Sequence, residues 1–146
     1  MSKTAYDIAR KNIFFCSEED FLPAVADRMQ KYNIGSIIVK SKHGKTTGIV
    51  TTGDILRFIS RNRDIHEVTA RQIMSSPVIT VHKDISIPEL IKCFKELQTT
   101  RLVLTKDNGD YVGVVRDIAA YKYISFVKFD KEAKERFGTS YFNRLY

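Results

Sequence analysis

An internal repeat constrains the fold of this 146-residue chain more than any other feature of its sequence. When the sequence is shifted by 65 positions, its two halves align without a gap. The turn-forming residues that coincide in this alignment are Pro23 with Pro88, Gly44 with Gly109, and Gly48 with Gly113. Self-similarity at a fixed period indicates one structural unit that is present twice. Because a unit of about 60 residues buries too little surface to be stable by itself, we expect the copies to pack into one domain.

Each copy has the hydrophobic pattern of a β-α-β-β-α unit. In the first copy, we expect a strand at residues 13–16, an amphipathic helix at 21–32, strands at 36–40 and 47–51, and a helix at 54–60. In the second copy, the corresponding elements are expected at 78–81, 87–97, 101–105, 111–115 and 117–126. The evidence is an apolar stripe at helical spacing and a hairpin signal at Asp107-Asn108-Gly109. The predicted fold class is α+β, with the two copies packed sheet to sheet about a pseudo-two-fold axis.

The repeat also divides the chain. We expect the first copy at residues 4–61, the second at 69–126, and a short polar connection between them. Residues 127–146 have no equivalent in the first copy and form a C-terminal tail that is charged and aromatic. The aromatic residues of this tail include Phe129, Phe137, Tyr141, Phe142 and Tyr146. So many aromatic side chains predict that the tail docks, either on its own core or on a partner chain.

Composition narrows the classes of partner and compartment. The net charge of +7 favours anionic partners, namely nucleotides, nucleic acid or an acidic protein face. No apolar run approaches the roughly 18 residues that cross a bilayer, and the first residues lack the apolar segment of a secretory signal. We therefore expect a cytoplasmic protein without a membrane partner.

The sequence offers little for catalysis or metal binding. Cys16 and Cys93 are too few and too far apart for a disulfide framework, and we expect buried free thiols. The three histidines have no ligand spacing with each other or with either cysteine. We find no nucleophile paired with a base and no glycine-rich phosphate loop, so no enzymatic activity is expected.

Two stretches of sequence resemble a known family. Residues 74–81 (MSSPVITV) resemble the opening of a CBS domain, the cystathionine-β-synthase repeat. Residues 48–56 (GIVTTGDIL) resemble its closing signature, Gly-apolar-apolar-Thr/Ser-x-x-Asp-apolar. The resemblance covers about residues 4 to 126 and is to a tandem pair of CBS repeats with no catalytic domain attached. It implies a regulatory module that senses adenosine-containing ligands for an unknown regulated protein, and a homodimer of two such pairs. AMP is the first choice of ligand, followed by ADP, ATP or S-adenosylmethionine.

The first copy carries the complete signature that this resemblance associates with ligand binding. The carboxylate of Asp54 can accept hydrogen bonds from both ribose hydroxyls, and the hydroxyl of Thr51 can contact a phosphate at the helix N-terminus. Family position implies that the adenine lies against Phe14, Phe15, Ile34, Gly35 and Ser36. It also implies that Arg101, in the second copy, reaches the phosphate of the same ligand. The alternatives are that Asp54 is merely a helix N-cap and that Arg101 is a solvated arginine.

In the second copy the signature is broken. Arg116 stands where the first copy has Thr51, and Ala119 stands where it has Asp54. We expect a second, weaker site formed by Met74, Ile79, Thr100 and Arg116, in which Arg116 attracts phosphate. The alternative is a cleft that serves only packing.

A cluster of arginines follows Asp54. Arg57 and Arg61 are four residues apart and share a helix face, and Arg63 follows them. The cluster is either solvated surface or a place that gathers polyphosphate or a nucleic-acid backbone. Two alternative functions therefore remain: a nucleic-acid-binding accessory protein, although the sequence has no recognised nucleic-acid motif, and a structural homodimer with empty clefts.

Overall fold

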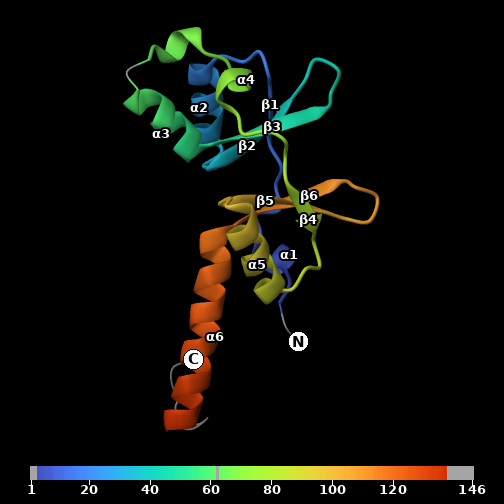
Figure 1. Cartoon of the computed structure of the whole chain (residues 1–146), viewed down its shortest axis with the longest axis vertical. Helices are drawn as coiled ribbons and strands as arrows, with labels where there is room; N and C mark the ends of the chain where they lie inside the picture. The colour runs from blue at the N-terminus through green and yellow to red at the C-terminus, as the bar shows by residue number, and fades with distance from the viewer. Residues whose placement is uncertain (1–2, 62, 138–146) are drawn as a thin grey trace. The chain divides into compact units, whose positions relative to one another are not determined.

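The computed structural model describes residues 3–61 and 63–137, and the chain forms two compact units (Figure 1). We call residues 12–80 the first unit. The second unit consists of the residues up to 11 together with those from 81 onward. The two copies therefore exchange their first segments. The N-terminal residues pack in the second unit, and the start of the second copy packs in the first unit.

The first unit is a three-stranded sheet with helices. Its elements are β1 (Phe15–Ser17), α2 (Leu22–Lys31), β2 (Ser36–Lys40), β3 (Thr46–Thr51), α3 (Thr52–Ser60), the 3-10 turn η1 (Ile65–Glu67) and α4 (Ala70–Ile73). The strand order is β1-β2-β3, with β1 parallel and β3 antiparallel to the central β2. Four consecutive residues of β2, from Ser36 to Val39, are buried, as expected for a central strand.

Helix α2 covers one face of this sheet because its apolar residues recur at helical spacing. Leu22, Val25 and Met29 are buried, and Pro23 lies in the first turn, where its missing amide hydrogen costs little. Val25 and Met29 belong to a core cluster that also contains residues of β1, β2, β3 and α4. The first unit thus has its own apolar core.

The second unit repeats this plan. Its elements are α1 (Ala5–Ile8), β4 (Thr80–His82), α5 (Ile87–Leu97), β5 (Arg101–Thr105), β6 (Tyr111–Arg116) and α6 (Asp117–Phe137). The strand order is β4-β5-β6, and β5 is antiparallel to β6. Ser86 caps α5, whose residues Ile87, Leu90 and Phe94 are buried.

Most of the expected elements are confirmed, with differences at three places: helix α3 begins at Thr52 and not at Asp54, and the other two concern the first strands and the last helix. The first strand of each copy begins about two residues later than the apolar pattern indicates. The last helix does not end near Phe126 but runs on to Phe137. Residues 127–137 contain no glycine or proline, and Lys134 forms an ion pair with Asp130 one turn earlier, so nothing stops the helix there.

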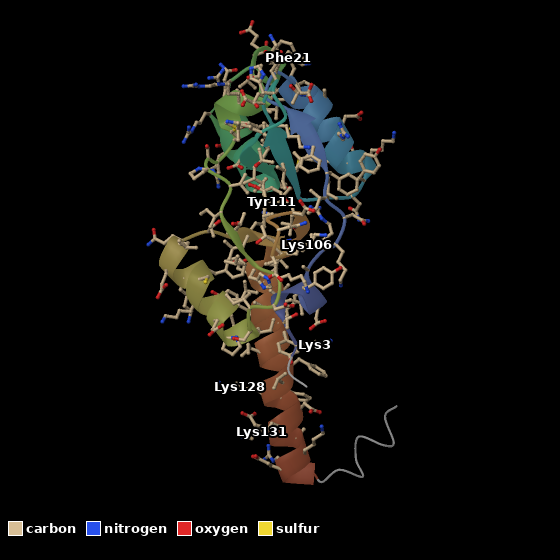
Figure 2. The ribbon with its side chains drawn as sticks, turned by 90° about the vertical axis from the view of Figure 1, so that its right-hand side faces the viewer. Lys3, Phe21, Lys106, Tyr111, Lys128 and Lys131 are labelled. Atoms are coloured by element: carbon tan, nitrogen blue, oxygen red, sulfur yellow. The ribbon has the colours of Figure 1, made fainter. Side chains whose placement is uncertain are left out.

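This extension places the first part of the expected tail on α6. Figure 2 shows Lys128 and Lys131 on this stretch of the helix, and the side chain of Phe129 is 66% exposed. The remaining tail aromatics, Tyr141, Phe142 and Tyr146, lie outside the described residues. None of the helices in the described ranges is both long enough and apolar enough to cross a bilayer.

The exchanged segments are held by the same contacts in both units. Isolated β-bridges join Ile49 to Ser75 and Phe21 to Thr69 in the first unit, and Val114 to Arg10 and Ser86 to Thr4 in the second. Each pair of bridges is related by the 65-residue shift. Gly48 allows this approach, since a Cβ atom there would lie 2.6 Å from Sδ of Met74 and 2.8 Å from the carbonyl oxygen of Ser75. Gly113 does the same in the second unit, beside the carbonyl oxygen of Arg10.

Candidate functional site

One edge of the first-unit sheet gathers most of the residues expected to bind a ligand. Phe14 immediately precedes β1, Ser36 begins β2 and Thr51 ends β3, so strand directions bring all three to the same edge. Ser36 is paired directly with Thr51, and the amide of Thr52 donates to the carbonyl oxygen of Gly35 at 3.0 Å. Helix α3 begins at this edge and carries Asp54 in its first turn.

Thr51 and Asp54 form a reciprocal capping box at the start of α3. Oδ2 of Asp54 accepts hydrogen bonds from the amide of Thr51 at 2.8 Å and from its hydroxyl at 3.0 Å. The amide of Asp54 in turn donates to Oγ1 of Thr51 at 3.2 Å. The N-cap is therefore Thr51, not Asp54, and Asp54 is its partner three residues later. The interpretation of Asp54 as the N-cap is wrong, because α3 begins two residues earlier than expected.

Asp54 is a buried carboxylate that keeps some capacity to accept hydrogen bonds. Its side chain is 7% exposed, and Nη2 of Arg57 donates to its Oδ1 at 2.5 Å. A carboxylate has about four acceptor positions, so these three bonds leave about one unused. A ligand that offers two hydroxyl groups has to displace one of the present donors.

The aromatic residues near this edge have partners that the sequence did not indicate. The ring of Phe14 stacks on Tyr32, with centroids 4.7 Å apart, and Nζ of Lys40 lies 3.8 Å from the ring centroid of Phe15. Ile34 is buried in the core cluster. Tyr32 belonged to the apolar stripe of the predicted helix, and nothing in its spacing distinguished it from a core residue.

The second unit has a corresponding edge with a different charge. The amide of Asp117 donates to the carbonyl oxygen of Thr100 at 3.0 Å, which is the same bond as between Thr52 and Gly35. Arg101 at the start of β5 is paired directly with Arg116 at the end of β6. This edge therefore carries two arginines where the first unit has Ser36 and Thr51. The structure thus brings Thr100, Arg101 and Arg116 to one edge. Ile79 immediately precedes β4 of the same sheet, whereas Met74 lies against Gly48 in the first unit.

A pocket opens beside α3 in the first unit. We call it the arginine pocket: it has a volume of about 220 Å³ and is lined by Asp54, Arg57, Phe58, Arg61, Arg63, Val68, Gln72 and Ile73. The sequence indicated the three arginines but not the pocket. Its opposite wall comes from Val68, Gln72 and Ile73. Gln72 and Ile73 belong to the start of the second copy in sequence and pack in the first unit only because the segments are exchanged.

Comparison with known proteins agrees with this architecture. A family model described as the CBS domain matches residues 5–61 and 70–125. An uncharacterized protein of Methanopyrus kandleri is 32% identical over 110 residues, which are 75% of this chain and 56% of that relative, so the chain spans about half of its length.

Two solved structures show the same fold. A hexameric CBS-CP12 protein from bloom-forming cyanobacteria has a TM-score of 0.77 at 18% identity, covering 88% of this chain and 75% of that one. A CBS domain pair in complex with 5′-methylthioadenosine and S-adenosyl-L-methionine has a TM-score of 0.69 at 23% identity, covering 84% and 99%. The family model accounts for both copies and well over half of the residues, so this chain belongs to the CBS domain family.

Proposed function

We propose that this pair of CBS domains is a regulatory module without catalytic activity that binds an adenosine-containing ligand at the edge formed by Gly35, Ser36, Thr51 and Asp54. The observation that carries the proposal is the buried carboxylate of Asp54, which is held in place by Thr51 and keeps about one acceptor position unused. A CBS domain pair of similar fold holds 5′-methylthioadenosine and S-adenosyl-L-methionine, two ligands that contain an adenosine group. AMP is our first choice, followed by ADP, ATP and S-adenosylmethionine.

The contacts follow from the chemistry of each group. The ribose hydroxyls donate to Asp54, and one of them takes the place of Arg57 at Oδ1. The adenine lies near Phe14, Phe15 and Ile34, with backbone groups of Gly35 and Ser36 at its edge. Arg101 contributes a positive charge for the phosphate. Through such binding the module would report the cytoplasmic adenylate pool to a regulated protein that is still to be identified.

Calorimetric titration of AMP into the purified chain tests this proposal. We expect Asp54→Asn to weaken AMP by about ten- to a hundredfold, because a hydrogen bond to a charged group contributes roughly 1.5–3 kcal/mol. Asp7→Asn is the matched control. Asp7 forms the same capping box with Thr4 at the start of α1 but belongs to the second unit. Unchanged AMP affinity in Asp54→Asn would exclude Asp54 as the ribose contact. Parallel titrations of ADP, ATP, S-adenosylmethionine and NAD rank the ligands.

The same titration distinguishes the two copies. Arg116 and Ala119 replace the threonine and aspartate of the first copy, so we propose one tighter site per chain and a second, weaker one that includes Thr100 and Arg116. Binding to two indistinguishable sites would contradict this part of the proposal.

We also propose that the chain forms a homodimer. Leu56 and Ile59 on α3 are 61% and 48% exposed, and Ile118 and Tyr121 on α6 are 43% and 40% exposed. Apolar side chains exposed together on helices usually mark an interface. Sedimentation of the full chain and of a version that ends at Asp130 tests the dimer and the role of the tail. A monomer at high micromolar concentration would exclude the dimer, and equal dimerisation of the shortened chain would exclude the tail from its interface.

A further inference from the structure

The arginine pocket presents donors from two sides. Arg57 and Arg61 lie one turn apart at the end of α3, and Arg63 follows them. On the other side, Oε1 of Gln72 accepts hydrogen bonds from the amide of Thr69 at 2.9 Å and from its hydroxyl at 3.4 Å. These bonds fix the amide group of Gln72 and leave its two N–H donors for another partner. Helices α3 and α4, which carry Arg57 and Gln72, contact each other in the first unit (Figure 1).

Most of the positive charge around this pocket is not neutralised. Arg57 pairs with Asp54, but its side chain is still 65% exposed. Arg61 and Arg63 are exposed and form neither an ion pair nor a side-chain hydrogen bond with any residue in the described ranges 3–61 and 63–137. Three guanidinium groups around one hollow repel each other, and an anion placed between them relieves that repulsion.

Acidic residues in and beside the arginine pocket limit where an anion can bind. Within the pocket, Asp54 is the one acidic residue, and it is engaged by Thr51 and Arg57. Asp64 and Glu67 line an adjoining hollow on the η1 side. Hydrogen bonds from the amide and the ring of His66 lower the pKa of Asp64, so this carboxylate stays ionised at neutral pH. Its charge repels anions from the adjoining hollow, so an anion is held on the side of Arg57, Arg61 and Arg63.

From these features we infer that the arginine pocket binds a phosphate chain. A guanidinium group donates two parallel hydrogen bonds to phosphate oxygens, and its planar shape suits this better than an ammonium group does. The volume of the pocket, about 220 Å³, leaves room for more than one phosphate group. The ligand is an inorganic oligophosphate or the phosphate chain of a nucleoside di- or triphosphate. This inference requires no contact with adenosine and goes beyond the AMP site proposed above.

Calorimetric titration of sodium tripolyphosphate into the full chain tests the site directly. We expect the wild type to bind one tripolyphosphate per chain at the arginine pocket, and the double variant Arg61→Gln/Arg63→Gln to bind it at least tenfold more weakly. The matched control is Lys42→Gln/Lys45→Gln, which removes the same charge from exposed positions around the hairpin between β2 and β3 of the same unit. The control should keep wild-type affinity. All three proteins should unfold at the same temperature, because none of the four side chains is buried.

Two results would overturn the inference: no tripolyphosphate binding by the wild type, or equal losses in the arginine and lysine variants. Competition between ATP and tripolyphosphate identifies the source of the phosphate chain. If ATP and tripolyphosphate exclude each other and ATP weakens in the arginine variant, the pocket holds the chain of a nucleotide. If ATP and tripolyphosphate bind together, the pocket holds an inorganic chain. The variant Asp54→Asn tests the AMP site separately. It weakens AMP binding only if the proposed function is correct, and this result does not depend on whether tripolyphosphate binds.

Discussion

Nη2 of Arg57 lies 2.5 Å from Oδ1 of Asp54, one turn earlier on the same helix, while Oδ2 of Asp54 holds the helix N-cap at Thr51. One buried carboxylate therefore has two roles in this structure and a third in the proposed complex, where a ribose hydroxyl replaces Arg57. It fixes the start of α3, orients an arginine of the neighbouring pocket and is our proposed contact for ribose. A change at this position affects stability and binding together, and the two effects have to be measured separately.

Loss of the Asp54 side chain should destabilise the protein. In Asp54→Ala the amide of Thr51 loses its acceptor, and loss of a helix cap typically costs about 0.5–2 kcal/mol in the free energy of unfolding. Asp54→Asn retains an acceptor oxygen and should cost less. Urea unfolding without ligand measures both variants. A stability of Asp54→Ala equal to that of the wild type would show that this capping box contributes nothing.

Arg101 should discriminate between ligands with and without a phosphate. If its guanidinium group contacts the phosphate of the ligand held by Asp54, Arg101→Ala should weaken AMP by about tenfold or more and leave adenosine nearly unchanged. Titration of both ligands into this variant gives the comparison. Equal losses for the two ligands would remove Arg101 from that role.

Gly48→Ala should destabilise the first unit. The new Cβ atom would meet the carbonyl oxygen of Ser75, which cannot withdraw without breaking its hydrogen bond with the amide of Ile49. Overpacking of this kind costs about 1–3 kcal/mol. The control is Gly53→Ala on α3, where the nearest atom is the flexible end of Arg57 at 3.4 Å and alanine favours the helix. Urea unfolding should rank Gly48→Ala well below Gly53→Ala, and the reverse order would contradict the close approach.

The stability of the fold should decrease in alkaline solution because of Cys16. Burial raises the pKa of this thiol from its ordinary value of 9.0 to about 11. Between these values the unfolded chain has released the thiol proton while the folded chain retains it, so folding is favoured below pH 9 and the advantage is lost as the pH rises toward 11. We expect the free energy of unfolding to fall between pH 8 and 10 by about 1 kcal/mol more in the wild type than in Cys16→Ala. Identical slopes in the wild type and Cys16→Ala would contradict the burial of this thiol.

Much of the fold could be predicted because its signals are local. The strands at Ser36–Lys40 and Arg101–Thr105 were located from short apolar runs next to turn residues, and both are confirmed at their expected bounds. The end of α6 was wrong because the repeat has no counterpart beyond residue 126, and alignment of the copies carries no information there. The spacing of Thr51 and Asp54 identified two residues that do lie together, but it could not show that Arg57 already occupies the carboxylate.

The arginine pocket could not be predicted, for a different reason. Hydrophobic periodicity indicates which face of an element is buried, but not which distant segment covers it. Gln72 and Ile73 were assigned to the start of the second copy by their position in the sequence, and the structure places them against α3 of the first. A prediction that treats each copy as a separate folding unit cannot find contacts between one copy and a segment of the other.

The reciprocal exchange has a consequence for the ancestry of the chain. A precursor with one copy would carry this segment too, and if it kept the exchange, the segment would lie against the strand edge of a second identical chain. Such a precursor is a swapped dimer whose assembly depends on protein concentration. Gene duplication then tethers the two halves and replaces that dependence with a fixed effective concentration. Cutting the present chain between the copies, at residues 62–68, would restore the dependence on concentration. Each fragment would carry the segment that completes the other, so each would fold only by binding the other fragment.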